Sequence, residues 1–160
     1  MVGIGDIDTH EPYCAEIARQ LDIPVISVDY RLAPEHPFPA APEDCEAAAR
    51  WVADNIPCTG LILSGDSAGG NLAAVVCLAW RDAGEAVPLA FQLLIYPATD
   101  MRASAPSHTS NGQGYVLTSD TIAYFQRHYL GPDQLTDWRA SPLLHGNLAG
   151  LPPALVLTAG

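Results

Sequence analysis

Residues 61–72, LILSGDSAGGNL, place a Gly-x-Ser-x-Gly motif between a short apolar run and a helical pattern. The run from Gly60 to Ser64 predicts a strand, and apolar residues recur at helical spacing from Ala68 until just before Gly84. A strand that turns directly into a helix is the context in which this motif exposes a nucleophilic serine. The stretch therefore predicts a nucleophile elbow centred on Ser67.

Each small residue of the turn has an expected role. A sharp turn forces Ser67 into a strained backbone conformation, so we expect Gly65 and Gly69, two residues to either side, to lack side chains because a Cβ would collide. The backbone N–H of Ala68 lies at the start of the following helix, where it can donate to a developing oxyanion while the helix dipole adds positive potential. This arrangement predicts acyl transfer through Ser67.

A plainer interpretation of the same glycines remains open. Gly65, Gly69 and Gly70 could simply form a tight turn or cradle a phosphate. The chain contains no lysine for a phosphate-binding loop and lacks the Gly-x-Gly-x-x-Gly spacing, which disfavours nucleotide binding. Asp66 belongs to the elbow, where it either shapes a pocket or bonds nearby backbone.

Strand-like and helical stretches alternate along the rest of the chain. Helices are expected at His10–Leu21 with Thr9 as N-cap, from about Pro42 to 56, and at Ser119–Leu130; further strands are expected at Ile23–Tyr30, Ala90–Tyr96 and Pro153–Ala159. The proline-rich segment 31–42 is expected to be an extended loop, and residues 97–118 to be irregular. Crossovers of this length predict an α/β fold, a parallel sheet with helices on both faces, in a single domain spanning residues 1–160.

Composition narrows the possible partners. The 160 residues carry a net charge of −11, with 18 acidic residues against 7 cations, all arginine. Such a surface repels phosphate backbones and anionic lipids, so neither nucleic acid nor a membrane is an expected partner. No run approaches the ~20 apolar residues of a membrane span, and residues 1–10 do not resemble a signal peptide.

The cysteines predict no cofactor or metal site. Ligand spacing is missing, and the four sulfurs are expected to be small buried hydrophobes in a reducing compartment: Cys14, Cys45, Cys58 and Cys77. A cytoplasmic protein is therefore expected. Because the predicted strands are apolar and no lysine protects an edge, homo-oligomerisation is also expected.

Several separated motifs together resemble one family. The segments VDYRLAPE (28–35) and PFPA (37–40), the elbow GDSAGG (65–70) with Asn71 and Leu72, and Tyr96-Pro97 are similar to hormone-sensitive-lipase-like carboxylesterases of the α/β-hydrolase fold. The resemblance runs from about Gly5 to Gly160. It implies hydrolysis of small acyl esters by a serine esterase without a cofactor, and a proline-rich loop that buttresses the oxyanion region, with Arg31 and Glu35 expected to pair there.

The departures from the family pattern are equally specific. The family's His-Gly-Gly-Gly oxyanion motif does not occur, and its catalytic Asp and His would fall beyond Gly160. The resemblance therefore implies an internal fragment of a longer hydrolase, with weak or no activity of its own. The alternative is a non-catalytic binding or scaffold module that keeps the fold.

A base within the chain is the other possibility. Candidate bases and carboxylates are His108, His128, His145, Asp100, Asp120, Asp133 and Asp137. Asp133 or Asp137 with His145 would follow Ser67 in the usual chain order. His10 and His36 are expected to have helix-start and loop-packing roles.

Overall fold

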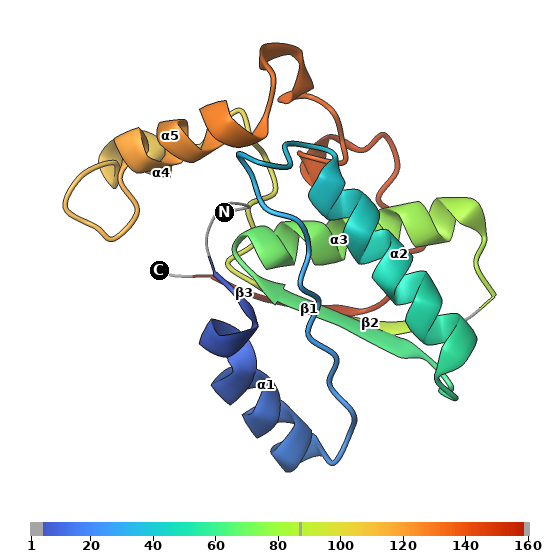
Figure 1. The fold of residues 1–160 in the computed structure, drawn as a ribbon. Helices are drawn as coiled ribbons and strands as arrows, with labels where there is room; N and C mark the ends of the chain where they lie inside the picture. Colours follow the sequence, from blue (N-terminus) through green and yellow to red (C-terminus); the bar gives the residue numbers. More distant parts are fainter. Residues whose placement is uncertain (1–4, 87, 159–160) are drawn as a thin grey trace.

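A three-stranded parallel sheet lies at the centre of the structure, a computed structural model that describes residues 5–86 and 88–158 (Figure 1). The strands are β1 (Leu61–Asp66), β2 (Leu89–Ile95) and β3 (Ala154–Leu157), in the order β1-β2-β3. Gly65 lies opposite Leu94, and Leu94 lies opposite Val156. The carboxyl ends of the strands therefore meet at one edge, where Ser67 follows β1.

Helices lie on both sides of this sheet. They are α1 (Ile7–Leu21), α2 (Ala40–Asn55), α3 (Ala68–Ala83), the single turn α4 (Ser107–Ser110) and α5 (Ser119–Tyr129), with 3₁₀ turns η1 (Pro132–Gln134) and η2 (Pro142–Leu144). In Figure 1, α2 and α3 lie above the sheet and α1 lies below it. The predicted parallel α/β architecture is confirmed.

The helix that follows Ser67 forms the centre of the core. Ten residues of α3 are buried, and Val76 and Trp80 pack with Ala49 of α2 and with Leu61 and Leu63 of β1. α3 is buried because it is covered on two sides: β1 and β2 pack against one side of the helix, and α2 packs against another. The start of α3, and with it Ser67, is thereby held in the best-packed part of the chain.

A second cluster joins the proline-rich loop to the beginning of α3. Phe38 of that loop meets the ring of Tyr129 edge to face, with centroids 5.9 Å apart, and its amide donates to the Tyr129 carbonyl. Both side chains pack with Ala68 and Leu72 of α3. The loop therefore covers the first turn of the helix that carries the candidate site.

The first helix begins earlier than predicted. It starts at Ile7, and its N-cap is Asp6, whose side chain accepts a hydrogen bond from the Thr9 amide while the Thr9 hydroxyl bonds back to Asp6. The prediction of Thr9 as N-cap was wrong because Thr9 occupies the third helical position of a capping box.

The predicted strand at Ile23–Tyr30 does not form. Residues 24–32 are without regular secondary structure, and each strand assigned in the described part of the chain lies elsewhere. Ile23, Val25, Ile26 and Val28 are 36–47% exposed. An extended apolar segment becomes a strand only when a neighbouring strand pairs with its backbone. Composition alone therefore predicted one strand too many.

These exposed apolar residues predict that the 160-residue chain self-associates. At tens of micromolar, sedimentation should show species larger than a monomer, and the pair Val25→Lys and Val28→Lys should shift the distribution toward monomer. The pair Thr109→Lys and Gln113→Lys adds the same charge at exposed positions and should leave it unchanged. A wild-type chain that sediments only as a monomer would contradict the prediction.

Candidate active site

Ser67 has a backbone conformation that few residues with side chains adopt. Its φ is 50° and its ψ is −109°, between the end of β1 and the start of α3. Its amide donates to the Ile95 carbonyl at 2.8 Å, and its own carbonyl accepts from the amides of Asn71 and Ala98 at 3.1 and 3.2 Å. The segment after β2 therefore holds this strained turn, which projects the serine from the end of a strand.

The glycines of the elbow differ in what their missing side chains allow. A Cβ on Gly65 would lie 2.3 Å from the carbonyl carbon of Gly69, and a Cβ on Gly70 would lie 3.0 Å from both the Gly65 oxygen and Pro97. A Cβ on Gly69 would meet no described atom within 4 Å. The expectation that a side chain at position 65 would collide is therefore confirmed. The same expectation for position 69 was wrong, and the second crowded glycine is Gly70.

Ala68 directly follows Ser67 and begins α3. Its side chain is buried against the proline-rich loop, and the amides of a first helical turn have no acceptor within the helix. Such an amide, with the positive end of the helix dipole, can stabilise negative charge next to Ser67.

Sequence reasoning missed a buried anchor, Asn71. This side chain is 2% exposed, and its amide nitrogen lies 2.5 Å from the carbonyl oxygen of Ala98 and 2.7 Å from that of Ala140. It ties the first turn of α3 to two segments that follow later in the chain. A polar residue at a position that helical periodicity turns inward is the signal that could have identified it.

The triad considered within the chain is not assembled around His145. Its Nε2 lies 3.0 Å from a carboxylate oxygen of Asp82, and its Nδ1 lies 2.8 Å from the Asn147 carbonyl oxygen. Asp82 is in the last turn of α3, roughly 20 Å along the helix from Ser67. Asp137 bonds Arg139 instead, so that alternative was wrong.

The other candidate histidines lie on peripheral helices. His128 is exposed on α5, and its Nδ1 lies 2.7 Å from the Tyr124 carbonyl oxygen, while His108 belongs to the short α4. Among the elements that the structure describes, β1 makes its main contacts with β2 and α3, and neither α4 nor α5 is one of these two.

His10 does lie beside the elbow. Its Nε2 is 3.3 Å from Oδ1 of Asp66, the residue before Ser67. The helix-start role expected for His10 is therefore incomplete, because the ring also connects α1 to the end of β1. The two partners are 56 positions apart in the sequence, and no local pattern could have predicted this contact.

The proline-rich loop uses a different ion pair from the one expected. Arg31 bonds both carboxylate oxygens of Asp44 on α2, at 2.7–3.1 Å, and its backbone amide donates to the same carboxylate. These hydrogen bonds lower the pKa of Asp44. The predicted Arg31–Glu35 pair was wrong, since Asp44 accepts from both the guanidinium and the backbone amide of Arg31.

Asp100, considered as a catalytic carboxylate, instead organises the loop after β2. It accepts hydrogen bonds from the Arg102 side chain at 2.8 and 2.9 Å and from the Ser104 hydroxyl at 3.2 Å. The side chain is 15% exposed. These donors, chiefly the Arg102 guanidinium, hold the pKa of Asp100 well below its usual range.

This lowered pKa predicts an acid-dependent contribution to stability. The contribution is complete above about pH 4 and is lost as the pH falls through the lower pKa of the folded state. Asp100→Asn should be less stable than wild type at pH 7, with the gap narrowing below about pH 4 in urea titrations. Asn55→Ala, which removes a hydrogen bond made by an uncharged side chain, should show no such convergence. If the difference in unfolding free energy between wild type and Asp100→Asn stayed constant down to pH 3, the stabilising role of the Asp100 carboxylate would be refuted.

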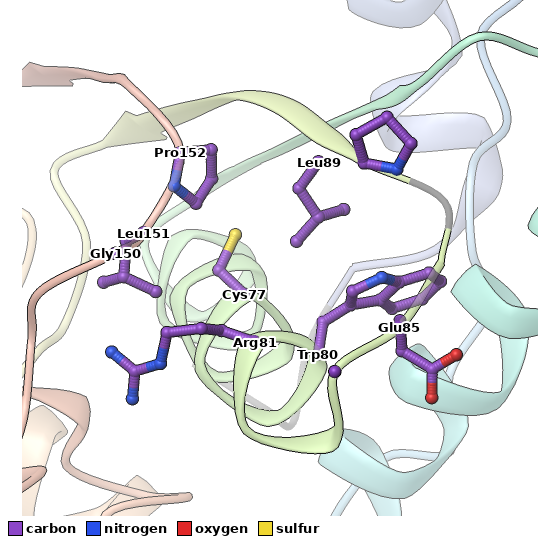
Figure 2. Close-up of a pocket in the computed structure, with 10 residues that line it drawn as sticks. Cys77, Trp80, Arg81, Glu85, Leu89, Gly150, Leu151 and Pro152 are labelled. Atoms are coloured by element: carbon purple, nitrogen blue, oxygen red, sulfur yellow. The ribbon is translucent and has the colours of Figure 1, made fainter.

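A pocket lies at the opposite end of α3 from Ser67. It holds about 300 Å³ between the end of the helix, the start of β2 and residues 150–152. Figure 2 shows Cys77 pointing from α3 toward the space between Leu89 and Pro152. Burial raises the pKa of the Cys77 thiol to about 12, so this sulfur is packing and not a nucleophile.

The other cysteines are less enclosed than predicted. Cys14 and Cys45 are half-buried and Cys58 is exposed, so the expectation of four buried sulfurs was wrong for Cys58, which follows the end of α2. Within residues 5–86 and 88–158, no three His, Cys, Asp or Glu side chains form a metal-binding group. No helix in that part of the chain is long and apolar enough to cross a membrane.

A strand, a serine at positive φ and a helix with a buried first turn match the geometry that the Gly-x-Ser-x-Gly motif takes in α/β-hydrolase proteins. The profile of the family described as alpha/beta hydrolase fold matches residues 2–160, and the chain belongs to that family. The predicted kinship with carboxylesterases is confirmed by its relatives. Esterase LipI of Mycobacterium tuberculosis is 46% identical over a match that covers 98% of this chain and 51% of that protein.

More distant relatives and solved structures agree. An ethyl acetate hydrolase of Pseudomonas putida is 36% identical, with 98% of this chain and 51% of that protein matched. A hyperthermophilic esterase from Pyrobaculum calidifontis superposes with a TM-score of 0.89 at 43% identity, covering 96% of this chain and 52% of that one. The chain spans about half the length of the curated relatives it matches.

Proposed function

We propose that Ser67 is the nucleophile of a serine carboxylesterase that hydrolyses short acyl esters through an acyl-enzyme. The observation that carries this proposal is the strained Ser67 between β1 and α3, with φ of 50° and a buried alanine following it. Relatives named esterase and ethyl acetate hydrolase support small esters as the substrate class.

The proposed reaction has two steps at one site. The Ser67 hydroxyl gives its proton to a base as its oxygen attacks the ester carbonyl, and the tetrahedral oxyanion accepts a hydrogen bond from the Ala68 amide. The ester C–O bond then breaks, and the base returns the proton to the departing oxygen, so that the alcohol leaves. Water then attacks the acyl-enzyme, which releases the acid and restores the hydroxyl. Gly65, Asp66, Gly69 and Gly70 form the elbow that presents Ser67.

We propose further that the 160-residue chain by itself turns over slowly or not at all. His145 and His128 are bonded elsewhere, and a missing general base typically costs about 10²–10⁴-fold in rate. One missing oxyanion donor costs roughly another 10²–10³-fold. Turnover of a short-chain aryl ester near the ~10 s⁻¹ of an ordinary enzyme would overturn this part of the proposal.

A fluorophosphonate probe followed by intact-mass spectrometry tests the nucleophile directly. We expect slow addition of one phosphonyl group per chain, located at Ser67 by peptide mapping and abolished in Ser67→Ala. Ser64→Ala, at an exposed serine of β1, is the matched control and should label like wild type. Absence of labelling on a folded wild-type chain would favour the alternative, a non-catalytic binding or scaffold module on the same fold.

The proposed location is a reducing cytoplasm. The four cysteines are free, and Cys45 and Cys77 have thiol pKa values raised to about 12 by burial. Free thiols persist where glutathione and thioredoxin keep them reduced. Recovery of the protein from the cytosolic fraction of its own cells would support this location.

A further inference from the structure

The elbow is bonded on one flank by β2 and the segment after it. The Ser67 amide donates to the Ile95 carbonyl, and the Ala98 amide donates to the Ser67 carbonyl. Within the described chain, β2 is the one strand that pairs with β1. On the side of β1 away from β2, the contact that the structure describes for Asp66 comes from His10 of α1.

Asp66 points its carboxylate toward that side. Its Oδ1 lies 3.3 Å from Nε2 of His10, and the two side chains are 39% and 46% exposed. The contact joins α1 to the last residue of β1, directly before Ser67. No residue of α1 is buried, so this helix has little apolar packing to hold it in place.

The His10 ring is oriented from its own helix as well. Its Nδ1 lies 3.1 Å from the Thr9 hydroxyl and 3.4 Å from the Asp6 carbonyl oxygen. Asp6 and Thr9 are the two members of the capping box that begins α1. Both ring nitrogens therefore have partners, and the ring connects the start of α1 to Asp66.

Tyr30 belongs to a third element near the elbow. Burial, and then the negative charges of Cys45 and Asp66, raise the pKa of Tyr30 to about 12. Tyr30 packs against the core cluster that contains Ala68. The segment that ends at Tyr30 therefore borders the start of α3, next to Ser67.

We propose that His10 is a positioning residue for Ser67, acting through Asp66. The pair holds the flank of the elbow that β2 does not reach and limits the orientations of the serine. The expected effect on the rate of attack rests on the proposed function of Ser67. The restraint of the elbow by the His10–Asp66 contact rests on geometry alone. Because reactive groups must be held within a few tenths of an ångström, loosening this flank lowers the rate of attack more than it lowers affinity.

The test separates the rate of phosphonylation from affinity for the fluorophosphonate in wild type, His10→Gln, Asp66→Asn and the double variant. We expect each single variant to lower the maximal rate about 10-fold with little change in the half-saturating concentration. The double variant should be no slower than the slower single variant, because both changes remove one contact. Additive losses, or a His10→Gln variant as fast as wild type, would overturn the proposal.

A matched control and a second measurement distinguish failure of the proposed function of Ser67 from failure of the proposed role of His10. His145→Gln breaks the His145–Asp82 pair at the far end of α3 and should leave phosphonylation unchanged. Hydrogen exchange of the Ser67 amide should be about two- to five-fold faster than in wild type in each single variant. In the double variant it should be no faster than in the single variants. If wild type is not labelled at all, the proposed function fails, while exchange still decides whether His10 restrains the elbow. Unchanged exchange in His10→Gln would show that it does not.

Discussion

Gly65→Ala is expected to destabilise the protein by roughly 3 kcal/mol or more. The new Cβ would lie 2.3 Å from the carbonyl carbon of Gly69 and 2.4 Å from its oxygen, and both are backbone atoms that cannot rotate away. The start of α3 would have to move from the end of β1, which also displaces Ser67. Urea unfolding at pH 7 measures the loss directly, and labelling of Ser67 by fluorophosphonate should fall in the same variant.

Gly69→Ala is the matched control for this change. It adds the same methyl group four residues later, where no described atom lies within 4 Å. Because alanine has the higher helix propensity, the variant should lie within about 1 kcal/mol of wild type. Equal destabilisation by the two substitutions would contradict the distinction between the two glycines.

Asn71→Ala is the second change with a large expected effect, a loss of about 2–4 kcal/mol in unfolding free energy. It removes the donor to the Ala98 and Ala140 carbonyls, and Ala140 is completely buried. Leaving a buried acceptor without a partner costs about 1–3 kcal/mol for each group. Denaturant unfolding, with m-values compared to verify a single transition, measures the loss.

Asn55→Ala provides the comparison at an exposed site. The Asn55 amide also donates to a backbone carbonyl, that of Trp51 at 2.8 Å, but at the exposed end of α2 where water can replace it. Its loss should cost less than about 1 kcal/mol. If Asn71→Ala were as mild as Asn55→Ala, water would have to reach the carbonyls that Asn71 now satisfies.

Local pattern predicted the central elements closely. The apolar run and the helical spacing around Ser67 correspond to β1 and α3, and Ala90–Tyr96 differs from the observed β2 by one residue at each end. α3 is largely buried and one face of β1 and β2 packs against it, so the periodicity of these elements reflects that packing. The motif located the elbow for the same reason, because strand, turn and helix are contiguous in the chain.

Features that depend on distant partners were not predictable in this way. Several acidic residues flank Arg31 in the sequence, and only the fold shows that Asp44 of α2 is the acceptor. The segment 23–30 has strand-like composition, yet pairing is a property of the neighbour and not of the segment. His10 and Asp66 belong to different elements, and no spacing rule brings them together.

The two ends of α3 are each tied to segments much later in the chain. Asn71 bonds the Ala98 and Ala140 carbonyls near its start, and Arg81 bonds those of Asn147 and Ala149 near its end. In evolutionary terms, a substitution at either position alters contacts made by residues encoded far downstream. Drift along α3 should therefore require compensating changes at several places at once, whereas α1, with no buried residue, can diverge one position at a time outside His10 and its cap.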